Sequence, residues 1–142
     1  MHSFYFCGSI RGGRELAFRY EQIIALLQTH GEVLTEHLGS DHEIQLKDRI
    51  LSDQQIHDRD LQWIKDSDMV IAEVTIPSLG VGYEIGRAIH YGKPVLCLFH
   101  ADAVHTLSAM ISGCNELEVV QYTHVEELPK QIHAFISSYS KD

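Results

Sequence analysis

Residues 69–99 read MVIAEVTIPSLGVGYEIGRAIHYGKPVLCLF and carry the pattern that decides the fold. A short apolar run from Met69 to Val74 is followed by an amphipathic segment from Val81 to Tyr91, and then by a second apolar run from Val95 to Phe99. Short apolar runs of this kind are typical of buried parallel strands, and a helix between two of them forms a strand–helix–strand unit. We therefore predict such a unit here, with its helix stopped by the Gly-Lys-Pro sequence at 92–94.

The same alternation of apolar runs and amphipathic segments continues on both sides of this unit. It predicts one domain over residues 1–142, an α/β fold with a single open parallel sheet of five strands between two layers of helices, flavodoxin-like or Rossmann-like. The stretch from Leu38 to Leu51 has no clear period, and we expect an irregular loop there that could act as a lid. The expected strands lie at Ser3–Cys7, Val33–Leu34, Met69–Val74, Val95–Phe99 and Leu117–Gln121, and the expected helices at Arg14–His30, Ser52–Lys65, Val81–Tyr91, Val104–Ser112 and Glu126–Ser138.

The composition limits the classes of function open to the chain. Its formal net charge is -9 and its 11 Lys and Arg are scattered, whereas binding a nucleic-acid backbone needs clustered positive charge, so we expect no nucleic-acid partner. No stretch approaches the apolar length of a membrane span and the first residues do not form a leader, so we expect no membrane association and a cytoplasmic location, with the nucleus added in a eukaryotic source. The 10 His lack the short paired spacings of zinc ligands, and we expect neither a metal nor a cofactor.

Two loops containing glycine and serine follow predicted strands, at Gly8–Gly13 and at Thr75–Gly82. Ligands of open parallel sheets bind at the carboxyl ends of the strands. Both loops are therefore candidates for a phosphate site built from backbone N–H groups, serine hydroxyls and Arg11. The alternative, that these loops are only turns, stays open. Neither loop has the Gly-Lys-Ser/Thr ending of a Walker A loop or the Gly-x-Gly-x-x-Gly dinucleotide pattern.

Two carboxylates stand out from the helical patterns around them. Asp60 shares a helix face with Ile56, Trp63 and Ile64, so it needs a structural partner, or it contacts a ligand or holds a proton for transfer. Glu84 is expected in the first turn of its helix, where the helix dipole favours the ionised form that a nucleophile needs. An ordinary first-turn glutamate paired with an arginine three residues on would also account for it. Together the two carboxylates suggest separate acid and nucleophile roles.

Six blocks of sequence, far apart along the chain, are found together in one known family. The blocks are YFCGSIRGGR at 5–14, VLTEH at 33–37, HxxDLxW at 57–63, AEVTxPSLGVGYExGRA at 72–88, GKPxLCLF at 92–99 and LSAMI at 107–111. They closely resemble the 2′-deoxynucleoside 5′-phosphate N-hydrolases of the nucleoside 2-deoxyribosyltransferase-like family. The resemblance implies an enzyme that cuts the bond between base and sugar in a 2′-deoxynucleoside 5′-monophosphate, on the same fold.

The resemblance also implies roles for individual residues. Glu84 matches the nucleophile that attacks C1′ of the sugar, and Asp60 matches the carboxylate associated with protonating the departing base. Tyr5 matches a tyrosine at the sugar end of the pocket. Ser108 matches a serine that reaches the phosphate from a neighbouring subunit, and Met110 closes the base end, so a homodimer is expected. The expected substrate contacts are Gly8, Ser9, Ile10, Arg11, Ser78, Gly80, Glu84, Ser108 and Met110.

Two other kinds of function stay open on the sequence. A nucleoside 2-deoxyribosyltransferase, or a ribonucleotide N-glycosidase of the CMP type, would use the same fold and the same carboxylates. The serine and arginine residues of the loops favour a monophosphate over a free nucleoside as the small-molecule partner. A non-enzymatic nucleotide sensor would need the phosphate loops but neither Asp60 nor Glu84.

Overall fold

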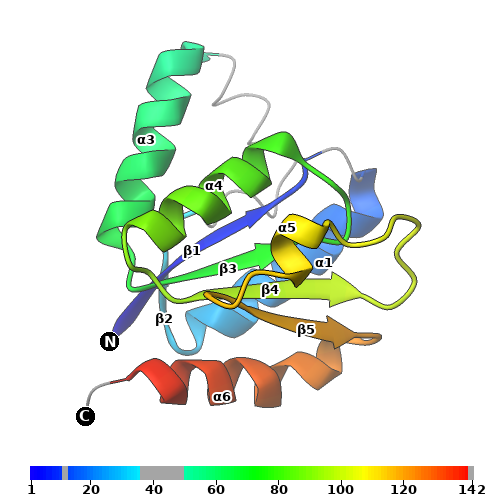
Figure 1. Cartoon of the computed structure of the whole chain (residues 1–142). Helices are drawn as coiled ribbons and strands as arrows, with labels where there is room; N and C mark the ends of the chain where they lie inside the picture. The colour runs from blue at the N-terminus through cyan, green and yellow to red at the C-terminus, as the bar shows by residue number, and fades with distance from the viewer. Residues whose placement is uncertain (11–12, 36–49, 141–142) are drawn as a thin grey trace.

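The computed structural model describes residues 1–10, 13–35 and 50–140, and it confirms the predicted α/β fold around one parallel sheet (Figure 1). The sheet has 5 strands in the order β2-β1-β3-β4-β5. The strands are β1 (His2–Gly8), β2 (Gly31–Val33), β3 (Met69–Glu73), β4 (Val95–His100) and β5 (Glu118–Tyr122), and the helical segments are α1 (Gly13–Gln28), α3 (Asp53–Asp66), α4 (Leu79–His90), α5 (Ala109–Ser112), the 3₁₀ turn η2 (Val125–Glu127) and α6 (Leu128–Tyr139).

The strand order places β1 beside β3, although the chain leaves these two strands in opposite directions. From β1 it passes through α1 to β2 at one edge of the sheet, whereas from β3 it passes through α4 to β4 toward the other edge. The register pairs Gly8 with Glu73, so the loops that follow β1 and β3 begin next to each other. In open parallel sheets a reversal of this kind marks the place where ligands bind.

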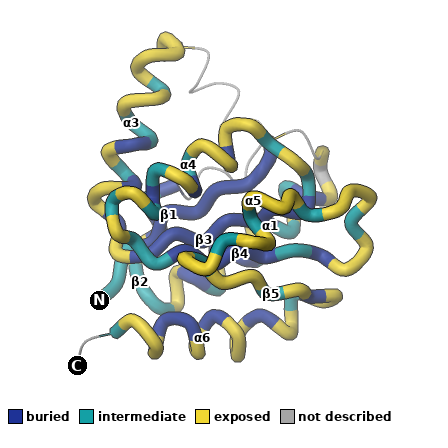
Figure 2. Tube along the Cα trace, viewed as in Figure 1, coloured by how far each residue is buried: buried dark blue, intermediate teal, exposed yellow. Residues whose placement is uncertain are grey.

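The central strands are apolar because helices cover both of their faces. All residues of β3 are buried, and Figure 2 shows the same burial along the middle of the sheet. Side chains alternate between the faces, so Phe4 and Phe6 pack in the half of the core that α1 and α6 cover. Tyr5 and Cys7 pack in the other half, against residues of α3 and α4. The face of the sheet under α3 and α4 therefore has a tyrosine hydroxyl within an otherwise apolar surface.

Local sequence signals set the ends of the helices. Ser52 caps α3 in a reciprocal capping box with Gln55, close to the predicted start of this helix. Ser78 caps α4, because its hydroxyl accepts a hydrogen bond from the N–H of Val81 at 3.3 Å. Beyond the other end of α4, Gly92 adopts a φ of 73°, a left-handed conformation that favours glycine. The predicted stop after Tyr91 is confirmed.

The predicted start of α4 is wrong by one half turn. Because Ser78 acts as a helix cap and not as part of a turn, α4 begins at Leu79, two residues before the predicted Val81. Glu84 therefore lies in the second turn of the helix, and its predicted place in the first turn is wrong.

Other differences lie in the C-terminal third of the chain. The predicted helix at Val104–Ser112 is a single turn, α5, and Val104 is 94% exposed, so its side chain adds no burial that would support a longer helix. The last helix begins at Leu128 after a 3₁₀ turn and runs to Tyr139. The predicted loop at Leu38–Leu51 falls almost wholly outside the described residues. Within 1–10, 13–35 and 50–140, no helix has the length and apolar character needed to cross a membrane.

Candidate active site

A hydrogen bond joins Tyr5 and Glu84, two of the predicted site residues. The hydroxyl of Tyr5, on the central strand β1, donates to Oε2 of Glu84, on α4. Tyr5 is 1% exposed and Glu84 is largely buried. The contact links residues 79 positions apart, so the strand–helix packing of the fold creates it. The structure thus places a largely buried carboxylate beside Tyr5, between β1 and α4.

Burial changes the proton affinity of this carboxylate. The pKa of Glu84 rises from 4.5 to about 7, first because burial disfavours the charged form, while the hydrogen bond from Tyr5 acts in the opposite direction. The negative charge of Asp60 raises the pKa further, and the positive charge of Arg59 lowers it. The expectation that the helix dipole holds Glu84 ionised is therefore wrong, since a second-turn residue gains little from the dipole and desolvation is the larger effect.

Asp60 comes close enough to Glu84 for their charges to interact, and the acid and nucleophile roles of the two residues stay predictions. It lies on α3 and its side chain is 25% exposed, whereas the buried residues of that helix are Leu61 and Ile64. The expectation that Asp60 lies within the buried stripe is thus only partly correct. Nε and Nη2 of Arg59 each lie 2.9 Å from Oδ1 of Asp60.

Arg59 is a site residue that the sequence analysis did not identify. Its guanidinium lies 4.7 Å from the ring centre of Trp63, one helical turn further along α3. The i,i+4 spacing of an arginine and a tryptophan was the available signal. Neighbouring residues on a helix face different directions, however, and the sequence does not reveal that Arg59 turns toward Asp60.

Contacts between side chains hold α3 against α4. Nε2 of His57 lies 2.9 Å from the hydroxyl of Tyr83, and Arg87 donates to the same hydroxyl at 2.7 Å. Arg87 also donates to Tyr91 at 2.6 Å. The arginine three residues after Glu84 thus binds two tyrosine hydroxyls, which leaves the explanation of Glu84 as the partner of Arg87 without support. Of these contacts, the one between His57 and Tyr83 joins the helix that carries Asp60 to the helix that carries Glu84.

The loop after β3 places Ser78 and Gly80 beside the carboxylate. A methyl group at Gly80 would lie 3.8 Å from Oε1 of Glu84 and 3.8 Å from Oγ of Ser78. The serine hydroxyl and the carboxylate therefore both lie close to Gly80, which is exposed at the start of α4. The backbone N–H groups of a first helical turn suit an anion. A nucleotide phosphate bound there would be close to Glu84.

A buried carboxylate fixes the beginning of this loop. Glu73, the last residue of β3, has no exposed surface, and it accepts hydrogen bonds from the hydroxyl of Tyr122 and, at 2.8 Å, from the N–H of Thr75. Nη1 of Arg19 lies 3.9 Å from the same carboxylate. The sequence analysis did not identify this group, because its position inside the run MVIAEV gives no sign of a partner at residue 122.

The loop after β1 supplies the remaining predicted contacts. Ser9 is buried, and its carbonyl accepts a hydrogen bond from the hydroxyl of Tyr20 at 2.9 Å. Gly8 packs against the same ring: a methyl group there would lie 2.5 Å from Cζ of Tyr20. Ile10 is 58% exposed, and Arg11 lies outside the described residues. The position of Ser9 fits the predicted cradle, and the role of Arg11 stays a prediction.

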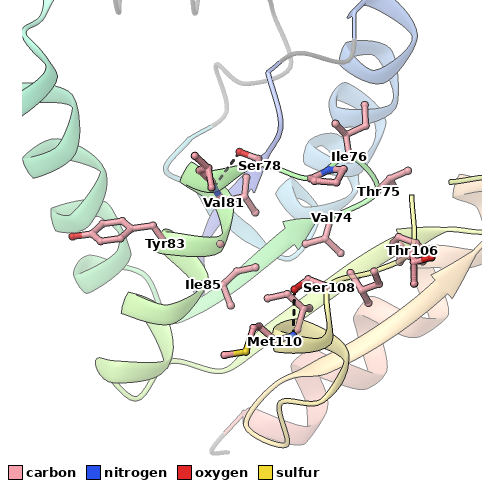
Figure 3. Close-up of a pocket in the computed structure, with 16 residues that line it drawn as sticks. Val74, Thr75, Ile76, Ser78, Val81, Tyr83, Ile85, Thr106, Ser108 and Met110 are labelled. Atoms are coloured by element: carbon pink, nitrogen blue, oxygen red, sulfur yellow. Dashed lines mark hydrogen bonds between the residues drawn. The ribbon is translucent and has the colours of Figure 1, made fainter. Parts of the chain in front are cut away.

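Ser108 and Met110 lie apart from the two carboxylates. They line an apolar cavity of about 520 Å³ between the loop after β3, α4 and α5, and Ser78 lines it as well (Figure 3). Figure 3 shows Ile85 of α4 and Ser108, which caps α5, among the side chains that line this cavity. Met110 is 82% exposed. The predicted site residues thus form two groups, one around Tyr5 and Glu84 and one along the cavity, and Ser78 is close to both.

The described residues contain no cluster of three or more His, Cys, Asp or Glu with the arrangement of a metal site. The chemistry available at the site comes from a tyrosine, two carboxylates, an arginine and the start of a helix. Glu84 can act as a nucleophile or accept a proton, and Asp60 can exchange a proton. Such a pair beside an anion-binding helix start is typical of enzymes that cleave a bond at a sugar carbon.

Fold and site therefore define a class, a single-domain α/β protein with a carboxylate pair at the carboxyl ends of its strands. The family described as nucleoside 2-deoxyribosyltransferase matches residues 4–127, and the chain belongs to this family. A Mus musculus protein named 5-hydroxymethyl-dUMP N-hydrolase is 47% identical over 141 residues, covering 96% of this chain and 81% of that protein. The Homo sapiens protein of the same name is 44% identical over 136 residues, covering 95% and 77%.

A solved structure gives the same fold at low sequence identity. The chain resembles a Clostridium botulinum CMP N-glycosidase with a TM-score of 0.63 and 18% identity, and the match covers 93% of this chain and 98% of that one. This likeness supports the arrangement of strands and helices. The predicted single-sheet α/β architecture is confirmed.

Proposed function

We propose that the protein hydrolyses the N-glycosidic bond of 2′-deoxynucleoside 5′-monophosphates and releases a free base and 2-deoxyribose 5-phosphate. The observation that carries the proposal is the buried Glu84 carboxylate, bound by Tyr5, near Asp60 and beside the start of α4. The names of the mouse and human relatives, both N-hydrolases of a modified dUMP, support the same reaction and substrate class.

The reaction takes place in two steps at C1′ of the sugar. Ionised Glu84 forms a bond to C1′ while the bond from C1′ to the base breaks, and the base leaves with the electron pair and takes a proton from Asp60. Water then attacks C1′, Asp60 takes the proton of that water, and Glu84 leaves as a carboxylate. The two steps return both carboxyl groups to their starting forms. Tyr5 holds Oε2 of Glu84, which leaves Oε1, the oxygen nearer Gly80, to attack.

The 5′-phosphate binds at the start of α4, where Ser78 and the N–H groups around Gly80 can donate to it. Ser9 contributes from the neighbouring loop, and the resemblance adds Arg11. A phosphate fixed beside Glu84 supplies binding energy that orients the sugar for attack. The net negative charge of the chain does not prevent this, because the local donors determine the potential at the site.

We also propose that a second copy of the chain completes the site. Met110 and Leu79 are 82% and 97% exposed at the rim of the apolar cavity that Ser78 and Ser108 line. Apolar side chains exposed around a cavity favour contact with another protein surface. Sedimentation velocity should give a dimer for the natural chain, and Met110→Asp should shift it toward the monomer. A natural chain that sediments as a monomer at micromolar concentration would remove this part of the proposal.

Chromatography of the products from a panel of deoxynucleotides and ribonucleotides tests the proposed reaction. Deoxynucleoside monophosphates should release free base, and Glu84→Gln should still bind them in a calorimeter while releasing none. Release of base by Glu84→Gln at the natural rate would exclude the nucleophile, and binding without any reaction in the natural protein would favour a nucleotide sensor. Adding a second base distinguishes hydrolysis from transfer, because a transferase would form a new nucleotide.

A further inference from the structure

The guanidinium of Arg59 is held on two sides. Its Nε and Nη2 both approach Oδ1 of Asp60 at 2.9 Å, and its Cζ lies over the ring of Trp63, 4.7 Å from the ring centre. Arginine is suited to such a position, since its planar group can stack on an aromatic ring while its edge binds a carboxylate. The side chain is only 22% exposed, so these contacts are partly shielded from water.

The two nitrogens converge on one oxygen of Asp60. An arginine often binds both oxygens of a carboxylate, one to each nitrogen. Here both contacts go to Oδ1, and they fix the rotation of the carboxyl group. A carboxyl group fixed in this way gives up a proton to the base and takes one from water in the same orientation.

Arg59 also acts on the second carboxylate. Among the described residues, the charges that act on Glu84 are those of Asp60 and Arg59, both on α3, and Arg59 carries the positive one. The two groups of β1 that face Glu84 are Tyr5, which donates a hydrogen bond to it, and the thiol of Cys7, whose pKa the charge of Glu84 raises. The charge of Arg59 lowers the pKa of Glu84, against the effects of burial and of Asp60. A nucleophile that loses its proton near neutral pH is sensitive to a charge of this kind.

We infer that Arg59 is a positioning residue, which orients Asp60 through Oδ1 and supplies the positive charge that keeps Glu84 available as an anion beside it. The inference rests on the proposed function. Trp63 helps to position Arg59, because its ring contacts the guanidinium. Arg59 touches neither substrate nor reacting atoms in this assignment, and it acts through Asp60 and Glu84.

Two substitutions separate the charge of Arg59 from its geometry. In Arg59→Gln the charge is lost, so the pH at which Glu84 loses half of its protons moves upward and kcat falls roughly tenfold, as for the loss of one charged hydrogen bond. In Arg59→Lys the charge stays but the contact of two nitrogens with Oδ1 of Asp60 is lost. We therefore expect kcat to fall while the titration midpoint of Glu84 remains near that of the natural protein. Lys65→Gln is the matched control, because it removes a cation of the same helix that lies 5.3 Å from Tyr91 and should change neither quantity.

The measurement combines pH profiles of kcat and KM with an NMR titration of the glutamate side chains. Protein labelled with ¹³C at the glutamate carboxyl carbons is titrated without substrate, and the signal missing from Glu84→Gln identifies Glu84. An unchanged Glu84 midpoint in Arg59→Gln would overturn the inference, even if activity fell, because the role would then be structural. Equal midpoints in the glutamine and lysine variants would overturn it as well. If the natural protein released no base, the proposed function would fail, whereas the titration would still decide whether Arg59 acts on Glu84.

Discussion

The phenol of Tyr5 and the carboxylate of Glu84 meet where β1 passes under α4, and the tyrosine donates its proton to Oε2. The bond stabilises the anion of Glu84, and therefore opposes the rise in pKa that burial causes. Burial and the negative charge of Glu84 in turn raise the pKa of Tyr5 well above its usual value, so the phenol stays protonated and remains a donor.

This relationship predicts the pH dependence of catalysis. Because Glu84 has a pKa of about 7 and must be ionised to attack, kcat/KM should rise with pH through about 7. In Tyr5→Phe the stabilising hydrogen bond is lost, so the rise should move to higher pH and the rate at neutral pH should fall. Tyr139→Phe, which removes a hydroxyl on α6, serves as the control. Identical profiles for the natural protein and Tyr5→Phe would contradict the assignment.

Burial of Glu84 also predicts how stability changes with pH. Its pKa is about 7 in the folded chain and near 4.5 when unfolded, so between these values only the folded state holds the proton. The stabilisation from Glu84 is complete below pH 4.5 and is lost as pH rises through 7, a change of at most roughly 3 kcal/mol. Denaturant unfolding at a series of pH values should show a steeper loss of free energy for the natural protein than for Glu84→Gln. If the free energies of unfolding of the two proteins changed with pH in parallel, Glu84 would not be the group that causes the pH dependence.

Ser78 caps α4 and is also proposed to bind the phosphate, so its substitution should affect both stability and KM. Ser78→Ala removes a helix cap and a phosphate donor, so the free energy of unfolding should fall by about 1 kcal/mol and KM should rise about tenfold or more. Ser52→Ala removes the equivalent cap from α3, away from the loop after β3, and should lower stability by a similar amount with KM unchanged. Steady-state kinetics and thermal unfolding of both variants give the comparison. An equal KM in the two variants would exclude Ser78 from phosphate binding.

Close packing behind the first loop predicts a stability defect at Gly8. Its added methyl group in Gly8→Ala would meet the ring of Tyr20 at 2.5 Å, which should lower the free energy of unfolding by about 1–3 kcal/mol. Since Tyr20 also holds the carbonyl of Ser9, nucleotide affinity should fall as well. Gly86→Ala is the control, because the space around that glycine is open and alanine favours a helix. Calorimetry of unfolding and of nucleotide binding tests both effects.

The sequence predicted the sheet because its signal is local. The runs at Met69–Val74 and Val95–Phe99 are long enough to be strands and too apolar to be exposed, and both are strands of the sheet. Helix caps were harder to predict than strands. Ser78 within Pro-Ser-Leu-Gly suits a turn as well as the cap of α4. For α5 the sequence predicted too long a helix, because the pattern at Val104–Ser112 is helical but no residue of α5 is buried.

The sequence proposes the residues of the candidate site, but it does not give the electrostatic interactions between them. The motifs around Glu84 and Asp60 identified both carboxylates, but the pKa of Glu84 depends on Tyr5, which lies 79 residues away, and on how deeply α4 packs. Arg59 illustrates the same limit, because its effect depends on a side-chain direction that neighbouring residues do not determine. Patterns in a sequence give the composition of a site, whereas burial and direction come from packing.

The chain leaves β1 and β3 toward opposite edges of the sheet, and this arrangement affects how the substrate selectivity of such proteins can change. The position where these two loops begin side by side follows from connectivity, because one loop leads to each edge of the sheet. Exchange of the side chains on these loops leaves the backbone path in place, so selectivity for a sugar or a leaving group can change while the scaffold persists. A shared scaffold at 18% identity to the Clostridium botulinum structure is what such a division between framework and lining allows.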